Sequence, residues 1–90
     1  TRVKEIQSTV ASLRLDSVAG EGFSVSRSKV AQEIKAERVK VNWKTVSNPA
    51  YFVKVNDVIS IRGRGRVIVE SVLGETKKGR LRIKLKRLMS

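Results

Sequence analysis

The side chains that most often perform catalysis are scarce in this sequence of 90 residues. It contains no His and no Cys, so the commonest general base and the most reactive nucleophile are both missing. No two carboxylates form a close pair in which one could act as an acid and the other as a base. The carboxylate residues of the chain are Glu5, Asp16, Glu21, Glu33, Glu37, Asp57, Glu70 and Glu75. We therefore expect no enzyme, no metal site, no cofactor and no small-molecule substrate.

Cations are the abundant chemical groups. The chain has 20 Lys and Arg against 8 Asp and Glu, which gives a formal net charge of +12. Self-repulsion on this scale destabilises a fold, and phosphates that bind the cations relieve it while releasing condensed counterions. The charge therefore indicates a polyanionic partner. A generally soluble basic protein without such a partner is the plainer alternative.

The glycines of the RGRGR stretch at 62–66 do not form a phosphate-binding loop. Neither the G-x-x-x-x-G-K-[ST] pattern nor the G-x-G-x-x-G pattern occurs there. Gly63 and Gly65 instead predict a bulge or a tight bend between two strands.

Hydrophobic spacing predicts two short helices that could position the cations. In the first, over 14–19, apolar residues recur three and four positions apart, and Gly20 and Gly22 are expected to end it. The second runs over 27–36, where Ser26 is a good N-cap because its hydroxyl can accept a hydrogen bond from a first-turn amide.

Strands are predicted on both sides of these helices. An irregular strand opens the chain over 3–13, and after the second helix the period of the apolar residues changes to two. The expected later strands are 39–41, which turns into a hairpin, 58–62, 67–73 and 80–86, with a turn at 74–79. The fold class is therefore α+β, in one domain that spans 1–90.

The last strand has two different faces. Leu81, Ile83 and Leu85 alternate with basic residues, so one face should be core and the other a cationic ridge of Arg80, Arg82, Lys84 and Lys86. Successive charges on this ridge lie about 7 Å apart. This spacing is close to the separation of neighbouring phosphates, so a nucleic-acid backbone could follow the ridge. Alternatively, they could protect an edge strand from pairing with another chain.

No apolar run approaches the roughly 20 residues that cross a bilayer, and the cytoplasm is the expected location. We expect no integral membrane association and a monomer. The first residue is Thr1 rather than Met, which predicts that the chain is part of a longer protein.

The order of residues over 14–61 forms a more specific pattern. Its members are Arg14, Leu15 and Asp16 at the first helix, Ser26, Arg27, Ala31 and Ile34 at the second, and then Val39, Val41, Asn42, Asp57, Ile59 and Ile61. This pattern resembles the S4 RNA-binding domain. The resemblance implies two helices on a small, mostly antiparallel sheet, with RNA meeting the helical side and the adjoining hairpin. The hairpin at about 66–88 is an addition to the motif.

Two positions depart from the family pattern, because many S4 domains have Gly where this chain has Glu37 and Trp43. The VNWK sequence at 41–44, with the opening strand and the C-terminal hairpin, is similar to the S4 domain that ends a bacterial and cyanobacterial group of cell-division or photosystem II proteins.

The resemblance and the clustered charge together predict an RNA-binding surface that favours ribosomal RNA, recognised by shape and phosphates. Its expected residues are Arg14, Ser26, Arg27, Lys29, Lys35, Arg38, Lys40, Asn42, Trp43, Lys44, Arg80, Arg82 and Lys84. Duplex DNA binding, and a basic module for acidic proteins or anionic membranes, are the alternatives.

Several of these residues also have a structural interpretation. Arg27 could pair with Asp16 rather than with RNA, and Asn42 could simply hold the turn. Phe52 is expected in the core. For Trp43 two alternatives stand, a position in the core or a ring that stacks on an unpaired base.

Overall fold

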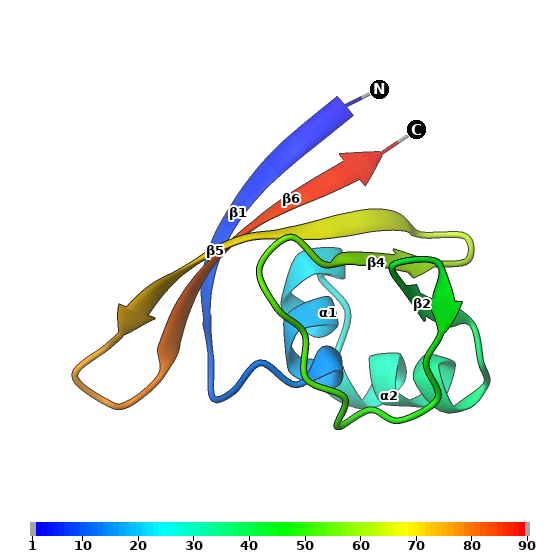
Figure 1. Cartoon of the computed structure of the whole chain (residues 1–90), viewed down its shortest axis with the longest axis horizontal. Coiled ribbons are helices and arrows are strands. Elements are labelled where there is room, and N and C mark those ends of the chain that lie inside the picture. Colours follow the sequence, from blue (N-terminus) through cyan, green and yellow to red (C-terminus); the bar gives the residue numbers. More distant parts are fainter. Residues whose placement is uncertain (1, 90) are drawn as a thin grey trace.

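A computed structural model describes residues 2–89 of the chain. Two helices pack against one six-stranded sheet, in which every pair of neighbouring strands is antiparallel (Figure 1). The helices are α1 (Leu15–Phe23) and α2 (Arg27–Lys35). The strands are β1 (Arg2–Val10), β2 (Val39–Val41), β3 (Lys44–Thr45), β4 (Val58–Ile61), β5 (Gly65–Glu75) and β6 (Leu81–Met89). The α+β prediction, with its C-terminal hairpin, is confirmed.

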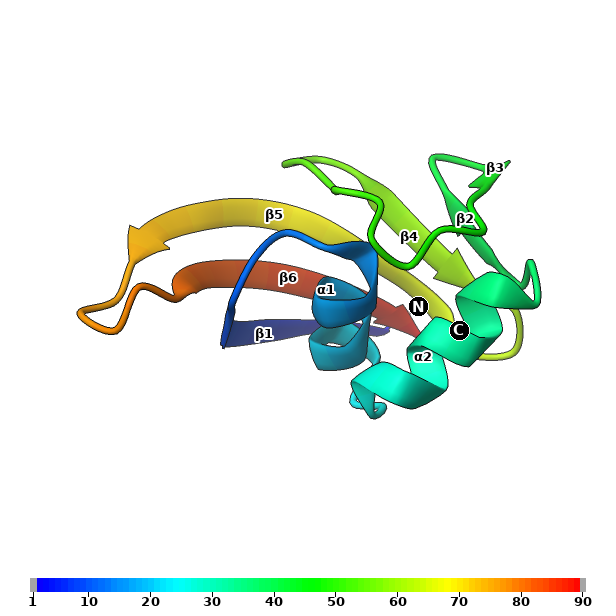
Figure 2. The ribbon, with the colours of Figure 1, turned by 90° about the horizontal axis from the view of Figure 1, so that it is seen from below.

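The strand order β1-β6-β5-β4-β2-β3 brings the two ends of the chain together. β1 pairs with β6 along its whole length, from Arg2 opposite Met89 to Val10 opposite Leu81. Figure 2 shows β5 and β6 as a long curved ribbon that extends beyond the helices. Since β6 lies between β1 and β5, its interpretation as an exposed edge strand is wrong.

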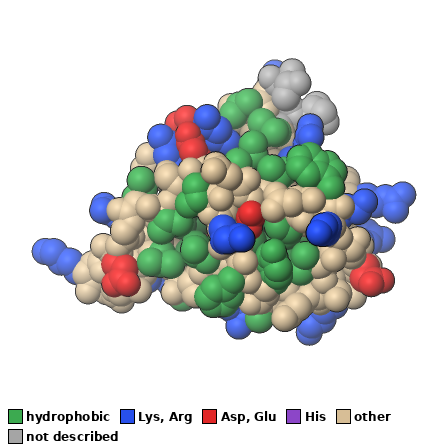
Figure 3. Space-filling model, viewed as in Figure 1, with side chains coloured by type: hydrophobic (Ala, Val, Ile, Leu, Met, Phe, Trp, Pro, Cys, Tyr) green, Lys and Arg blue, Asp and Glu red, His purple; other side chains and the backbone are tan. Residues whose placement is uncertain are grey.

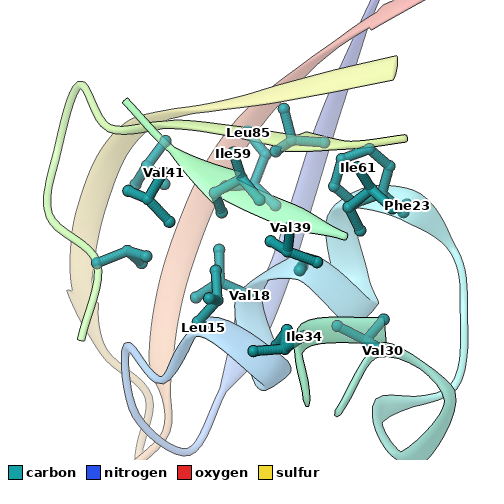
Figure 4. Close-up of a cluster of buried hydrophobic side chains, with 14 of the residues drawn as sticks. Leu15, Val18, Phe23, Val30, Ile34, Val39, Val41, Ile59, Ile61 and Leu85 are labelled. Atoms are coloured by element: carbon teal, nitrogen blue, oxygen red, sulfur yellow. The ribbon is translucent and has the colours of Figure 1, made fainter. Parts of the chain in front are cut away.

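The core lies between the helices and one side of the sheet. Figure 4 shows Leu15 and Val18 of α1 and Ile34 of α2 pointing toward Val39 of β2 and Ile59 of β4. Each of these side chains is fully buried, and burial of an aliphatic side chain of this size contributes about 1.5–3 kcal/mol. Alternating burial along β2 and β4 leaves Lys40 and Ser60, which are cross-strand partners, on the side of the sheet away from the helices.

The first helix is longer than predicted, because Gly20 and Gly22 lie inside α1 rather than at its end. A Cβ on Gly22 would lie only 2.8 Å from a Val67 methyl carbon, so the missing side chain lets the helix approach the sheet closely. The helix ends at Ser24, whose φ of 56° is left-handed.

Gly63 and Gly65 form the predicted bend, with φ of 83° and 100°, between β4 and β5. The C-terminal hairpin differs in detail: β5 continues to Glu75, and β6 begins at Leu81 rather than Arg80. Phe52 was expected in the core, but 62% of it is exposed, because Val53 is the residue of this segment that points inward. Neither helix is long and apolar enough to span a membrane.

Candidate nucleic-acid interface

Asp16 joins the N-terminal ends of the two helices. Its carboxylate accepts hydrogen bonds from Arg14 Nε and Nη2, each at 3.1 Å, and its Oδ2 lies 3.3 Å from Arg27 Nε. Only 5% of the Asp16 side chain is exposed, whereas the Arg14 and Arg27 side chains are 36% and 54% exposed. The predicted pairing of Arg27 with Asp16 therefore exists, and it leaves about half of the Arg27 side chain open to solvent.

Two opposing effects set the pKa of Asp16. Burial disfavours the charged carboxylate, but the hydrogen bonds and positive charges of Arg14 and Arg27 outweigh burial and hold the pKa below its ordinary value. Asp16 is consequently ionised at neutral pH and keeps both guanidinium groups in place.

The loop before β4 crosses the start of α1 and satisfies two of its free amides. Leu15 N donates to Tyr51 O at 2.7 Å and Asp16 N donates to Pro49 O at 3.2 Å, so these loop carbonyls replace a side-chain cap. A β-bridge joins Arg14 to Phe52, and both Phe52 and Tyr51 remain exposed. This segment thus sets an aromatic pair beside the Asp16 cluster, an arrangement that spacing along the sequence did not indicate.

Ser26 performs the predicted capping role, because its Oγ accepts from Lys29 N at 3.2 Å. Lys29 and Lys35 lie on the exposed part of α2, while Val30 and Ile34 are buried. Neither lysine has an ion pair with another described residue.

Asn42 braces the β2–β3 hairpin against the loop before β4. Its Nδ2 donates to Asp57 Oδ1, and its Oδ1 accepts from Val58 N, each at 3.0 Å. Asp57 is buried and also accepts from Lys54 N at 2.8 Å. The side-chain amide of Asn42 therefore holds the turn, as its structural interpretation predicts.

The link that follows α2, the β2–β3 hairpin and the end of β4 line an open hollow of about 620 Å³, the Trp43 hollow. The structure brings the predicted residues Arg38, Lys40 and Trp43 together in its lining. Arg62, which was not among the predicted residues, completes the group, since β2 and β4 are neighbours and Arg62 N donates to Arg38 O at 3.3 Å. Trp43 is 65% exposed, so it is not a core residue.

The three predicted residues of the C-terminal hairpin occupy different places. Arg80 Nε donates to Thr9 Oγ1 at 3.0 Å, and Arg80 Nη2 donates to Thr9 O at 2.9 Å. Arg80 also lines a second hollow, together with Ser26 and Arg27. Arg82 and Lys84 alternate with buried Ile83 and Leu85, so they project from the side of the sheet that also carries Lys40. Lys84 lies 4.0 Å from a Glu5 carboxylate oxygen.

Two further arginines serve the fold. Arg64 pairs with Glu33 at 3.2 Å, which ties the β4–β5 turn to α2. Arg87 lies 5.5 Å from the centre of the Phe23 ring and donates to Phe23 O at 3.3 Å. In Figure 3, many Lys and Arg side chains stand at the outline of the molecule, with hydrophobic side chains spread over the middle of the view.

Comparison with known families agrees with the arrangement of α1, α2 and the following hairpin. Residues 13–59 match the family model described as the S4 domain. The chain belongs to the S4 domain family. This match covers most of the 14–61 stretch on which the resemblance was based.

Individual relatives support the same assignment. The chain is 44% identical over 79 residues, or 88% of its length, to the "Ribosome-associated protein quality control protein P2" of Bacillus subtilis. It is 43% and 41% identical, over 54 residues or 59% of its length, to the "Small ribosomal subunit protein uS4" of Dechloromonas aromatica and of Azotobacter vinelandii. These matches span 31%, 26% and 26% of the three relatives, so this S4 domain corresponds to less than a third of each.

Proposed function

We propose that this S4 domain binds structured RNA, with ribosomal RNA as its substrate, and that it does so without catalysis. The observation that carries the proposal is a run of exposed cations on α2 and the β2–β3 hairpin, here called the α2–hairpin surface: Lys29, Lys35, Arg38, Lys40 and Lys44. None of them has an ion pair among the described residues.

Some of the other cations are already partly neutralised by carboxylates. Asp16 binds Arg14 and Arg27, Glu33 binds Arg64, and Glu70 lies 3.3 Å from Lys86. A cation with a protein partner must give up or share that interaction to bind a phosphate, whereas a solvated one need only release its counterions. Because the five cations that lack an ion pair among the described residues also follow one another along α2, the link after it and the β2–β3 hairpin, we favour the α2–hairpin surface as the phosphate-binding part of the domain.

The relatives' names suggest the class of RNA. One relative is described as ribosome-associated and others as proteins of the small ribosomal subunit. The shortage of aromatic residues, 4% of the chain, argues against a platform that stacks base after base along a single strand. We propose contacts with phosphates and the shape of folded RNA, in the cytoplasm, by a monomer.

A competition experiment separates this function from its rivals. The domain is titrated at one salt concentration with a ribosomal RNA stem-loop, a DNA duplex of matched length and charge, and vesicles that contain anionic lipid. We expect the RNA to compete best, by about tenfold or more over the DNA, and the domain to sediment with ribosomes. Equal affinity for RNA and DNA, or preferential binding to the vesicles, would contradict the proposal.

A further inference from the structure

The tip of the β2–β3 hairpin carries a large side chain in an unfavourable backbone conformation. Lys40 pairs with Thr45 and Val41 with Lys44, so the loop between the strands consists of Asn42 and Trp43 alone. Both residues have left-handed φ angles, 51° and 66°, as a type I′ turn requires. Asn tolerates this conformation well at the first position, but the second position favours Gly, and a bulky residue there is strained.

Folding does not explain the presence of Trp43. Glycine would form the same turn without strain, and 65% of the Trp43 residue is exposed, so its burial contributes little to the core. Asn42 makes the hydrogen bonds that fix the hairpin to the loop before β4. Strain of this kind, held by the surrounding structure, is typical of functional positions.

The surroundings of the ring specify a ligand with both an aromatic and an anionic part. Trp43 shares the Trp43 hollow with Arg38, Lys40 and Arg62, and Glu37 is the one carboxylate in the lining. The ring offers a flat apolar surface, and the three cations exceed the single acid by two charges. At about 620 Å³ the hollow falls within the size range of sites that accept small organic groups.

We propose that the Trp43 hollow receives one unpaired nucleotide of the bound RNA, with its base stacked on Trp43 and its phosphates facing Arg38, Lys40 and Arg62. The hollow adjoins the α2–hairpin surface, because it begins at Ala36, directly after α2, and shares Arg38 and Lys40 with that surface. The inference rests on the proposed RNA binding and narrows it: the preferred substrate is a stem with a bulged or looped-out nucleotide rather than a continuous duplex.

The chain offers a direct readout, because Trp43 is its only Trp. Tryptophan emission, excited at a wavelength that Tyr51 does not absorb, therefore reports this hollow alone. The domain is titrated with an RNA hairpin whose stem carries one unpaired adenosine, and with the same hairpin fully paired. We expect the bulged RNA to bind at least about fivefold more tightly than the paired RNA, which corresponds to the low end of the stacking free energy of one base on an aromatic ring. It should also quench the fluorescence of Trp43. The paired RNA should bind without comparable quenching.

Variants identify the ring as the cause of this preference. Trp43→Ala should bind the bulged and the paired RNA equally, at the affinity that the wild type has for the paired RNA, whereas Trp43→Phe should keep most of the preference. Phe52→Ala is the matched control, because Phe52 is similarly exposed, at 62%, but lies outside the hollow. It should keep the full preference. Circular dichroism checks that each variant is folded.

The outcomes distinguish this inference from the function on which it rests. Equal binding of both RNAs by the wild type, or a preference that survives Trp43→Ala, would overturn the nucleotide site while leaving RNA binding intact. Quenching by adenosine monophosphate alone at micromolar concentration would overturn it in favour of a free-nucleotide site. Failure to bind either RNA would overturn both proposals.

Discussion

Arg27 Nε of α2 lies 3.3 Å from Asp16 Oδ2 of α1, and this contact ties the first turns of the two helices together. Because Arg14 binds the same carboxylate, one buried acid holds two cations at the helical end of the candidate interface. Asp16 is thus a positioning residue for Arg14 and Arg27.

Replacing Asp16 with Asn should lower the free energy of unfolding by about 1–2 kcal/mol, since the charge-assisted hydrogen bonds are lost but both arginines are partly solvated. The effect should depend on pH. The pKa of Asp16 is lower in the folded state, so its stabilisation is complete above the unfolded-state pKa of about 4 and is lost as the pH falls through the folded-state pKa. Chemical denaturation between pH 6 and pH 2 measures this. Equal acid sensitivity of the wild type and Asp16→Asn would contradict it.

RNA affinity should fall steeply with salt. About five phosphate contacts over the whole interface predict a slope of log K against log salt near −4, at roughly 0.7–0.9 per contact. Binding isotherms at several salt concentrations give the slope. A flat dependence would rule out phosphate recognition as the main source of affinity.

Arg80, Arg82 and Lys84 of the C-terminal hairpin should extend the binding surface, whereas Lys77 and Lys78 at the tip of this hairpin should not. Arg80 borders the hollow that contains Ser26 and Arg27, while Arg82 and Lys84 project from the same side of the sheet as Lys40. Replacing Arg80, Arg82 and Lys84 with Gln should lower affinity and reduce the salt slope by about two to three units. The RNA affinity of Arg80→Gln, compared with that of the double variant Arg82→Gln, Lys84→Gln, shows whether the hollow beside Arg27 or the side of the sheet that carries Lys40 contributes. Unchanged binding by the triple variant would exclude the hairpin from the interface.

Trp43→Gly should be more stable than Trp43→Ala by about 0.5–1 kcal/mol, because Gly adopts the left-handed turn conformation without strain. Thermal or urea unfolding of the two variants measures the difference. Equal stabilities would mean that Trp43 is unstrained and would remove one argument for its functional role.

The spacing of residues along the sequence was sufficient to predict those elements of the fold that depend on neighbouring residues. The apolar spacing of Val30 and Ile34, the Ser26 cap and the alternation around Val39 and Val41 each correspond to an observed element. The prediction that Gly22 ends the first helix is wrong, because the role of Gly22 depends on Val67, a residue far away in the sequence.

The same limit applies to the candidate site. That β6 is an interior strand follows only from its pairing with β1 at the opposite end of the chain. Arg62 enters the Trp43 hollow because β4 lies beside β2, and Phe52 is exposed because Val53 occupies the inward position. Residue types and local spacing identified the cations, whereas their grouping and their ion pairs required the three-dimensional arrangement.

The most direct test of the account is reversal of charge on the α2–hairpin surface. Lys35→Glu, Lys40→Glu is compared with Lys77→Glu, Lys78→Glu, which makes the same charge change at exposed positions in the turn between β5 and β6. With circular dichroism unchanged in both, we expect the first variant to bind a ribosomal RNA stem-loop at least tenfold more weakly than the wild type, about 1.4 kcal/mol, and much more weakly than the second. If the two variants lose affinity equally, or the first binds RNA as the wild type does, the α2–hairpin surface is not the RNA-binding site.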